Sequence, residues 1–255
     1  MFLIFNRYIA ILIIFSLIIF FGALFEKTVE RYTYKLIDLI FTLKPQTKCS
    51  RDELLELNIR TIKPIRKDNF IESYNDWDIY EKKKYICPKN TVLILIDVWE
   101  NTNEKNDIFK KEVTRITENI IIPVSNKIRS MGGTIIHSPN GGNIYPNVYK
   151  KDEVNLAWTR KLPHNLQTLI LFWKLRSKGA KTIIYSGYST YLCLFDRPHG
   201  ILYTKYFSKY FSRLLLRDGT TGWQFSDKNP SFVNNFINYL EWKQLPSFSS
   251  SDLIN

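Results

Sequence analysis

Two residues of the sequence carry side chains that could act together in a reaction, an aspartate and a cysteine that each follow an apolar run. Asp97 ends the run "TVLILID", and Cys193 ends the segment "GYSTYLC", which directly follows "AKTIIYS". A thiol with its usual pKa of about 8.5 is mostly protonated at neutral pH, so a nucleophilic cysteine needs help. A helix N-terminus would favour the thiolate, and a nearby carboxylate could accept the proton. Asp97 and Cys193 are therefore candidates for a base and a nucleophile.

The same two residues also have a purely structural interpretation. Asp97 could cap a helix or shape a turn, and Cys193 could fill space in a core, which is a common use of free cysteine. A redox-active thiol is a third interpretation, although no CxxC pair and no obvious resolving cysteine accompanies Cys193. Spacing alone leaves these alternatives open.

From residue 91 onward, apolar runs alternate with helical patterns. The runs predict strands over 91–97, 132–139, 180–186 and 213–218. Apolar residues at helical spacing predict a helix over 107–131 that kinks or splits at Pro123, further helices over 165–178 and from about Leu192, and a closing helix over "SFVNNFINYLEW".

This alternation predicts right-handed βαβ units and a parallel sheet with helices on both faces. We therefore expect an α/β fold of three layers, α/β/α, with a mainly parallel sheet. Ligands of such sheets bind beyond the carboxyl ends of the strands. Asp97, His137 and the segment 187–193 all fall at strand ends, so the predicted order of elements brings them to one edge of the sheet.

The N-terminus has the composition of a membrane anchor. Residues 9–25 contain no charge, and their length is at the low end of the about 17–25 residues of a membrane span. A cleaved signal peptide has a shorter apolar region and a clearer cleavage site. We therefore expect a single-pass, uncleaved transmembrane helix within residues 1–25, with residues 2–25 contacting the membrane. Flanking basic residues weakly favour a cytoplasmic domain.

The remaining chain divides into three parts. Residues 26–90 are mixed and charged, with Pro, Asn and short helical patterns, and we expect a partly helical connector there. Residues 91–245 should form the α/β domain, and residues 246–255 a flexible tail.

Composition limits the partners that the chain can have. Lys and Arg exceed Asp and Glu by 36 to 24, for a net charge of +12, but the basic residues form no long run. We therefore expect no nucleic-acid partner. The three cysteines, an odd number without CxxC spacing, give no complete disulfide framework, and the three scattered histidines add no zinc cluster. No metal or other cofactor is predicted.

Three segments, in this order, resemble the isochorismatase-like cysteine hydrolases, a family that includes nicotinamidases and N-carbamoyl-amine amidohydrolases. "TVLILIDVWE" is similar to the family's first strand, "GYSTYLC" to its Gly–x–small–Thr–Asn–x–Cys segment, and "LRDGTT" to a later strand end. The resemblance covers about residues 90–242. It implies that Cys193 is the nucleophile and Asp97 the general base, for hydrolysis of a small amide or related C–N bond through an acyl-enzyme.

The resemblance also implies an oxyanion hole. A cis peptide bond that joins Tyr188 to Ser189 would turn the backbone N–H of Ser189 toward that of Cys193, and a lost donor of this kind typically costs on the order of 10²-fold in rate. Tyr191 stands where the family has Asn.

A third catalytic residue, a lysine in the family, has no clear counterpart. The matching position falls at Arg160, with Lys161 beside it, and an arginine does not readily exchange a proton. Trp99 stands where metal-binding members have histidine, so the resemblance implies no catalytic metal. Trp99 and His137 are the candidate substrate contacts.

Two functions follow from the resemblance. The first is a membrane-anchored cysteine hydrolase that acts on a small amide-like molecule. The second is an inactive member of the family that serves as a membrane-tethered binding module. A Lys or Arg side chain that reaches both Asp97 and Cys193 would favour the hydrolase. Family members often form oligomers, so a homo-oligomer is also expected, of no fixed number.

Overall fold

The computed structural model describes residue 35 and residues 47–67, 70–71, 77–100, 107–140, 144–222 and 231–254. The predicted anchor, residues 1–25, lies outside them. Within the described ranges, no helix is both long and apolar enough to cross a bilayer.

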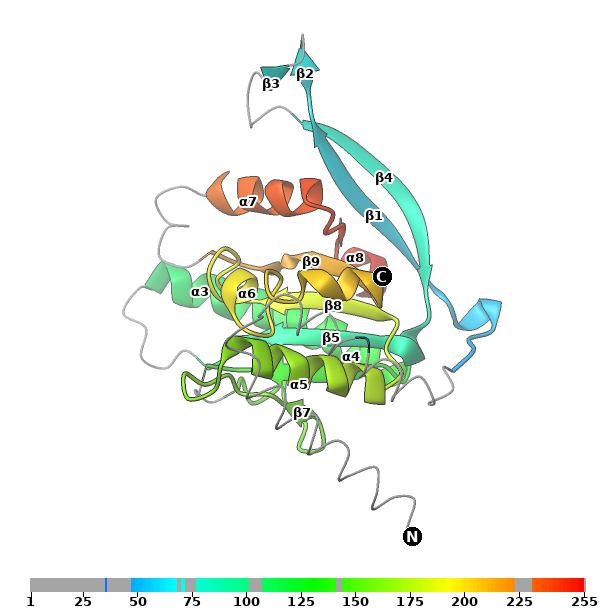
Figure 1. Ribbon diagram of the computed structural model, residues 1–255, viewed down its shortest axis with the longest axis vertical. Coiled ribbons are helices and arrows are strands. Elements are labelled where there is room, and N and C mark those ends of the chain that lie inside the picture. The colour runs from blue at the N-terminus through cyan, green and yellow to red at the C-terminus, as the bar shows by residue number, and fades with distance from the viewer. Residues whose placement is uncertain are drawn as a thin grey trace.

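An eight-stranded sheet forms the centre of the protein, in the order β4-β1-β10-β9-β8-β5-β6-β7 (Figure 1). Neighbouring strands from β10 to β7 run parallel, whereas β1 is antiparallel to both β10 and β4. The strands are β1 (Leu55–Pro64), β4 (Trp77–Ile86), β5 (Thr91–Ile96), β6 (Thr134–Ser138), β7 (Val154–Asn155), β8 (Thr182–Gly187), β9 (Ser212–Thr220) and β10 (Ser247–Phe248). A separate pair is formed by β2 (Arg66–Lys67) and β3 (Phe70–Ile71).

Helices cover both faces of this sheet (Figure 1). One apolar core lies beneath α5, α6 and α7, and the other beneath α3, α4 and α8. The helices are α3 (Asp107–Ile116), α4 (Ile122–Ser130), α5 (His164–Ser177), α6 (Cys193–Asp196), α7 (Ser231–Trp242) and α8 (Ser251–Ile254), with short turns η1 (Arg51–Glu53), η2 (Pro88–Asn90), η3 (Thr117–Ile121) and η4 (Lys205–Lys209). The predicted three-layer α/β/α fold with a mainly parallel sheet is confirmed.

The central strand β5 shows why the sheet needs helices on both sides. All six of its residues are buried. Because side chains alternate across a strand, Ile94 and Ile96 belong to one core while Leu93 and Leu95 belong to the other. A strand that is apolar on both faces is stable only when both faces are covered.

The long helix expected over 107–131 is divided, as Pro123 predicts. Between α3 and α4 lies η3, a π-helical turn over Thr117–Ile121. Proline has no N–H for the helical ladder, and a π turn is one local adjustment to such a gap. The turn places the hydroxyl of Thr117 against that of Tyr188, in the segment that leads to Cys193.

Within the predicted connector, residues 26–90, the structure describes mainly residues 47–67 and 77–90, and these form two long strands and short 3-10 turns instead of a connector. β1 and β4 pair over ten residues, and Leu57 and Ile59 are buried in the core. These strands extend the sheet on one side, so this part of the chain belongs to the domain. The sequence shows no apolar alternation here, because β4 is an edge strand with mostly exposed, charged side chains. Pro64, at the end of β1, also suggested irregular chain.

Residues 246–254 also belong to the folded domain, contrary to the flexible tail that we expected over 246–255. β10 pairs with β9, and α8 begins at Ser251 with Leu253 buried. Asp218 accepts hydrogen bonds from the backbone N–H and the hydroxyl of Ser250, at 2.9 Å and 2.6 Å, and from the hydroxyl of Ser249 at 2.9 Å. The C-terminal residues up to Ile254 are therefore part of the folded domain.

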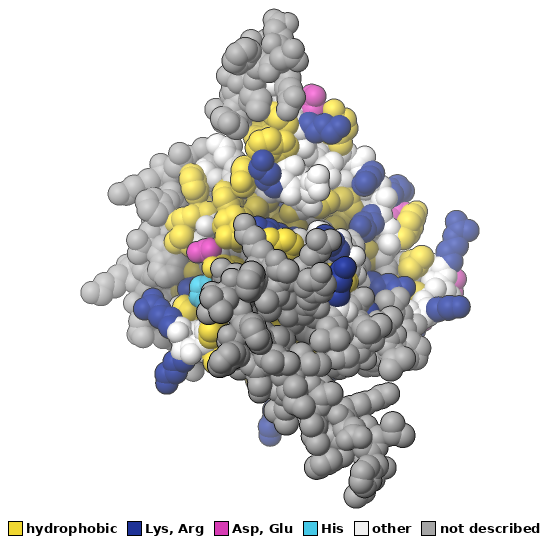
Figure 2. Space-filling view, viewed as in Figure 1, with side chains coloured by type: hydrophobic (Ala, Val, Ile, Leu, Met, Phe, Trp, Pro, Cys, Tyr) yellow, Lys and Arg dark blue, Asp and Glu magenta, His cyan; other side chains and the backbone are white. Residues whose placement is uncertain are grey.

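Basic side chains lie at several separate places on the face shown in Figure 2. On this face they alternate with apolar and uncharged side chains instead of forming one continuous strip. The arrangement agrees with a basic composition that is spread along the whole chain.

A disulfide bond joins Cys49 to Cys87, with their Cα atoms 5.8 Å apart. The number and spacing of the cysteines did not predict it, because the pairing depends on the β1–β4 hairpin, which brings residues 38 apart in sequence together. The bond leaves Cys193 as the free thiol of the chain.

Replacing Cys49 with serine is expected to lower the free energy of unfolding by about 2–4 kcal/mol, because the bond closes a loop between residues 38 apart in sequence. Denaturant unfolding of the two proteins measures the difference. A thiol count before and after reduction is the control, and an unchanged unfolding midpoint would contradict the assignment of this bond.

Candidate active site

Asp97 follows β5 directly, at the carboxyl edge of the sheet where a ligand site was predicted. Its backbone N–H donates to the carbonyl oxygen of Ser138 at the end of β6, at 3.0 Å. Asp97 has the left-handed backbone angle φ of 52° and is only 1% exposed. A buried carboxylate in a left-handed turn is uncommon, and such backbone conformations concentrate at functional sites.

Gly187 brings the second segment of the site against the first. At the end of β8 it has a φ of 136°, and a Cβ atom there would lie 2.0 Å from the carbonyl oxygen of Ile96. Only glycine allows the two strand ends to approach so closely. The next N–H, of Tyr188, donates to Ile96 O at 3.1 Å, which fixes the path of the chain beside Asp97.

A tight turn then leads from Tyr188 to Cys193. Ser189 has a φ of 55°, and its carbonyl oxygen accepts hydrogen bonds from the N–H groups of Leu192 and Leu194, at 3.0 Å and 3.2 Å. The N–H of Thr190 donates to Thr221 O, just beyond β9, at 2.9 Å. The turn is therefore held both internally and from the neighbouring strand.

The predicted cis bond between Tyr188 and Ser189 is wrong. Every peptide bond of the described residues is trans, and the positive φ of Ser189 makes the reversal instead. The oxyanion hole that depended on the cis bond, between the N–H groups of Ser189 and Cys193, is therefore not supported.

Three side chains meet at the end of this turn. Cys193 begins α6, is 5% exposed, and lies four residues before Arg197. Arg197 Nη2 donates to Cys193 Sγ at 3.4 Å, and Arg197 Nε donates to Asp97 Oδ2 at 3.2 Å. The guanidinium group thus joins the carboxylate to the thiol.

Burial dominates the electrostatics of this cluster. It raises the pKa of Cys193, and the neighbouring Asp97 carboxylate raises it further, to about 11, against the opposing effect of Arg197. Burial also raises the pKa of Asp97, opposed by hydrogen bonding to Cys193 and by the Arg197 charge. The thiol is therefore protonated at rest, beside a carboxylate whose basicity is increased.

The expectation that a helix N-terminus would favour the thiolate is wrong. α6 is a single turn of four residues, too short for a substantial dipole, and desolvation of the thiol outweighs it. A nucleophilic Cys193 would therefore need a group that accepts its proton.

Two buried oxygen atoms of the cluster have no hydrogen-bond partner within the described structure. They are Asp97 Oδ1 and Ser189 Oγ, each on a residue that is 1% exposed. Buried polar atoms are nearly always paired, and exceptions often mark reactive sites. Both side chains nonetheless act on the thiol of Cys193, since Asp97 raises its pKa and Ser189 lowers it.

The segment that follows Cys193 is fixed by a buried histidine. His199 Nδ1 lies 2.8 Å from Ser138 Oγ, and His199 Nε2 lies 3.2 Å from the carbonyl oxygen of Gln167. The carbonyl requires a donor, so the neutral ring carries its proton on Nε2 and accepts from Ser138. The hydroxyl of Thr168 donates to Pro198 O at 2.6 Å. These bonds fix the turn that carries Arg197.

Stability is expected to fall as the pH drops from about 6.5 to 4, because burial lowers the pKa of His199 from 6.5 to about 4. Between these pH values His199 binds a proton in the unfolded chain but not in the folded protein. Neutral, buried His199 therefore contributes its full stabilisation above pH 6.5, and this stabilisation is lost progressively as the pH falls to about 4. The difference is on the order of 3 kcal/mol. Urea unfolding against pH measures it. The variant His199→Gln, whose amide can replace both hydrogen bonds, should lose this part of the pH dependence.

Arg160 and Lys161, the expected third catalytic residues, do not lie at the site. Both side chains are exposed on the loop before α5. Among the described contacts, none joins either side chain to Asp97 or Cys193. Within the described residues the cation that contacts both Asp97 and Cys193 is Arg197, so the structure does not bring Arg160 or Lys161 to the cluster. The missed signal was local: Arg197 lies four residues after Cys193, within "DRPHG", and therefore one helical turn away.

Replacing Arg197 with glutamine is expected to lower turnover about 10²-fold or more, because the site loses its cation. Arg160→Gln and Lys161→Gln are the matched controls and should retain activity, since both residues are exposed. Steady-state rates of the three variants test the assignment. If Lys161→Gln lost turnover while Arg197→Gln kept it, the catalytic cation would be Lys161 and not Arg197.

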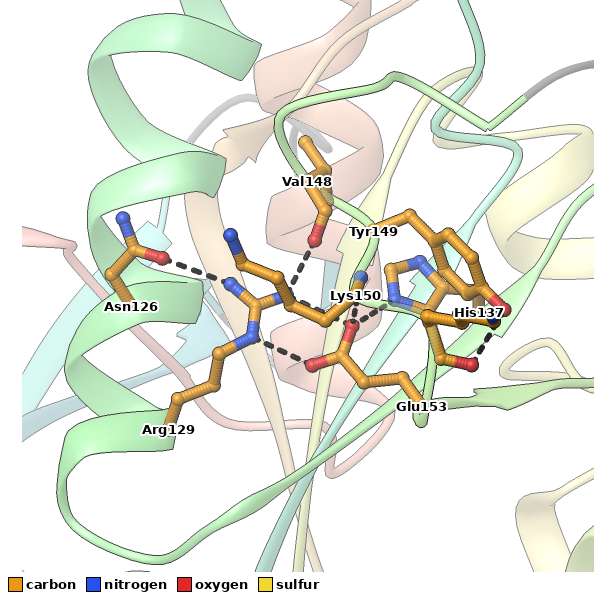
Figure 3. A network of polar contacts seen from close by, with 8 residues as sticks. Asn126, Arg129, His137, Val148, Tyr149, Lys150 and Glu153 are labelled. Carbon is orange, nitrogen blue, oxygen red and sulfur yellow. Dashed lines mark hydrogen bonds and ion pairs between the residues drawn. The ribbon is translucent and has the colours of Figure 1, made fainter.

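His137, a predicted substrate contact, is held in a buried polar network (Figure 3). Its Nε2 lies 2.8 Å from Glu153 Oε2, and its ring packs edge-on against Tyr149. His137 is 1% exposed, and its Nδ1 has no hydrogen-bond partner among the described residues, so its contact with substrate stays a prediction. Trp99 packs edge-on against Tyr188 with ring centres 5.5 Å apart, and its contact with substrate stays a prediction.

The fold and the cluster together define a three-layer α/β protein with a buried thiol, carboxylate and guanidinium at the carboxyl edge of its sheet. No family model matches the chain, and no curated protein matches it. Two similar solved structures share 14% identity with it.

One of these structures is an isochorismatase family protein from Desulfovibrio vulgaris subsp. vulgaris, with a TM-score of 0.49, covering 64% of this chain and 96% of that chain. The other is a cysteine hydrolase from Pseudomonas syringae pv. phaseolicola, with a TM-score of 0.46, covering 66% of this chain and 92% of that chain. The roles of individual residues rest on the geometry described above.

Proposed function

We propose that the protein is a cysteine hydrolase that cleaves a small amide or related C–N bond. Cys193 is the nucleophile, Asp97 the general base and Arg197 the cation that stabilises charge. The observation that supports this proposal is the position of Arg197, whose guanidinium contacts both Asp97 Oδ2 and Cys193 Sγ. A cation in reach of both groups is the feature that favours an enzyme over a binding module.

In the first half of the proposed reaction, Cys193 Sγ attacks the carbonyl carbon while Asp97 accepts the thiol proton. A C–S bond forms, and the carbonyl electron pair moves to oxygen. When that pair returns, the C–N bond breaks, and Asp97 gives its proton to the leaving nitrogen. Ammonia or an amine departs and a thioester remains on Cys193.

In the second half, water attacks the thioester carbon and Asp97 accepts a proton from that water. The C–S bond breaks, the acid product leaves, and Cys193 takes its proton back from Asp97. The cycle therefore needs no reactant other than the amide and water. Arg197 keeps its charge throughout, because a guanidinium does not deprotonate in proteins.

The raised pKa of Asp97 suits a base in this cycle. A carboxylate is normally a weak base, and burial increases its affinity for the proton. The raised pKa of the thiol keeps Cys193 neutral until a carbonyl carbon is in place. Arg197 then offsets the negative charge that develops during attack.

The inactive binding module is the second candidate, favoured by one observation. Cys193 is nearly buried, and its pKa is raised to about 11, as a core-filling cysteine would also show. A core-filling cysteine, however, has no need of a carboxylate and a guanidinium at its sulfur atom.

Ammonia release from a panel of primary amides and N-carbamoyl compounds tests the proposal, with intact-mass analysis for an acylated protein. We expect at least one compound to be hydrolysed and to acylate the wild type, and neither event with Cys193→Ser. Activity that survives in Cys193→Ser would contradict the mechanism. Absence of both turnover and adduct across the panel would favour the binding module.

We also propose that residues 1–25 anchor the protein in a membrane and that the domain faces an oxidising compartment. The disulfide bond between Cys49 and Cys87 supports the second part, because such bonds persist mainly outside the cytosol. This orientation is opposite to the one that the flanking charges weakly favoured. Thiol labelling of acid-quenched cells tests it: we expect one reactive thiol per chain, and three would indicate a reducing compartment.

A further inference from the structure

The indole ring of Trp158 lies against the guanidinium group of Arg197. Arg197 Cζ is 4.2 Å from the centre of the ring, within the range of a cation–π contact. Trp158 is 8% exposed, and its Nε1 has no hydrogen-bond partner within the described structure. The structural contribution of Trp158 therefore comes from the face of its ring and not from its N–H group.

The backbone before Trp158 is fixed along the edge of the sheet. β7 pairs with β6, and the pairing continues past the end of β7. The N–H of Leu156 donates to His137 O at 2.7 Å, and the N–H of Trp158 donates to Pro139 O at 3.1 Å. The ring is thus carried on an extension of the edge strand, at the carboxyl edge where Asp97 also lies.

The polar network of Figure 3 anchors the start of this segment. Glu153 lies directly before β7, and Arg129 of α4 donates to both of its carboxylate oxygens, at 2.6 Å and 2.9 Å. The same carboxylate is hydrogen-bonded to His137 of β6 and accepts a hydrogen bond from the backbone N–H of Lys150 at 3.0 Å. One half-buried carboxylate therefore joins the edge segment to a helix and a strand.

The backbone after Trp158 is fixed as well. The side chain of Gln167, on α5, accepts from the N–H of Thr159 at 2.9 Å and donates to the carbonyl oxygen of Thr159 at 2.8 Å. Trp158 is therefore held on both sides by hydrogen bonds to different layers of the fold, which makes its ring a rigid surface.

Arg197 needs such a surface, because its own hydrogen bonds are long and therefore weak. The distances of 3.2 Å to Asp97 Oδ2 and 3.4 Å to Cys193 Sγ exceed the about 2.7–2.9 Å of a strong charged hydrogen bond. The side chain of Arg197 is 21% exposed, so water competes for its donors. A planar guanidinium stacks well on an aromatic face, which limits its rotation.

We infer that Trp158 is a positioning residue whose ring holds Arg197 in the plane from which it reaches Asp97 and Cys193. The inference rests on the role proposed for Arg197. It predicts that the ring acts on the thiol only through the guanidinium, with no contact of its own to the reacting atoms.

The test is the rate at which iodoacetamide alkylates Cys193, measured against pH in the full chain. Since Arg197 lowers the pKa of the thiol, misplacing it reduces the thiolate fraction at every pH below that pKa. Trp158→Leu should lower the rate roughly 3- to 10-fold. Trp158→Phe keeps an aromatic face and loses no hydrogen bond, so it should remain within about 2-fold of the wild type.

The control is Trp173→Leu, which removes another tryptophan with a stacked cation, Lys174 at 4.5 Å, on the exposed surface of α5. It should not change the alkylation rate. In an Arg197→Gln background, Trp158→Leu should have no further effect, because the group it positions is absent.

The inference would be overturned if Trp158→Phe slowed alkylation as much as Trp158→Leu does. It would also be overturned if Trp158→Leu slowed alkylation by the same factor in the Arg197→Gln background as in the wild type. If Arg197→Gln itself leaves the alkylation rate unchanged, the proposed role of Arg197 fails. If Arg197→Gln slows alkylation and Trp158→Leu does not, only the role of Trp158 fails.

Discussion

Replacing Cys193 with serine is expected to abolish hydrolysis, with turnover falling on the order of 10⁴-fold or more. A serine hydroxyl is a much weaker acid than a thiol, and Asp97 as a carboxylate cannot deprotonate it effectively. The buried site offers no second thiol, since the other two cysteines form a disulfide bond. Turnover of the best substrate by the two proteins measures the effect.

The control for this substitution is the double variant Cys49→Ser and Cys87→Ser, assayed at a temperature where it is folded. It removes the other two cysteines and should keep full turnover. Serine at position 193 that leaves turnover within about 10-fold of the wild type would show that the chemistry occurs elsewhere.

Replacing Asp97 with asparagine is expected to move two quantities in opposite directions. Turnover should fall about 10²- to 10⁴-fold, because the general base is lost. The pKa of Cys193 should fall as well, because the carboxylate charge and its interaction with the thiol both raise that pKa in the wild type. The variant would therefore carry more thiolate at any given pH and yet turn over more slowly.

Iodoacetamide labelling across pH measures the thiol pKa in this variant, and steady-state assays measure its turnover. Asp196→Asn is the matched control, since it removes an exposed carboxylate from the same helical turn and should change neither quantity. A thiol pKa that stays unchanged in Asp97→Asn would show that the two side chains are not coupled.

Sequence patterns located the layers and the two central residues for a clear physical reason. β5 and β8 are apolar on both faces, because both faces are buried, and such continuous runs end visibly at Asp97 and Gly187. The cysteine that follows a strand end then falls at the carboxyl edge of a parallel sheet by topology alone.

The hairpin of β1 and β4 escaped prediction because an edge strand carries charged residues on its exposed faces. Lys82 and Lys83 lie within a strand whose side chains are mostly in solvent, so no apolar alternation marks it. The disulfide bond was equally hidden, because pairing depends on proximity in space and not on spacing.

Sequence spacing did not predict that Arg197 contacts the thiol and the carboxylate, because this contact depends on side-chain geometry. Arg160 and Lys161 lie on a loop whose direction is set by Gln167 and by the edge strand, and their side chains point to solvent. Arg197 reaches the thiol because α6 is one turn long and the histidine beyond it is anchored to Ser138. These contacts are not visible in residue spacing.

The most direct test of the central claim is the rate at which p-nitrophenyl acetate acylates Cys193 at neutral pH, in the wild type and in Asp97→Asn. The claim is that Asp97 removes the thiol proton during attack. It predicts that the wild type is acylated faster, by about 10-fold or more, although the variant carries more thiolate. Acylation of Asp97→Asn at the rate of the wild type, or faster, would contradict the account.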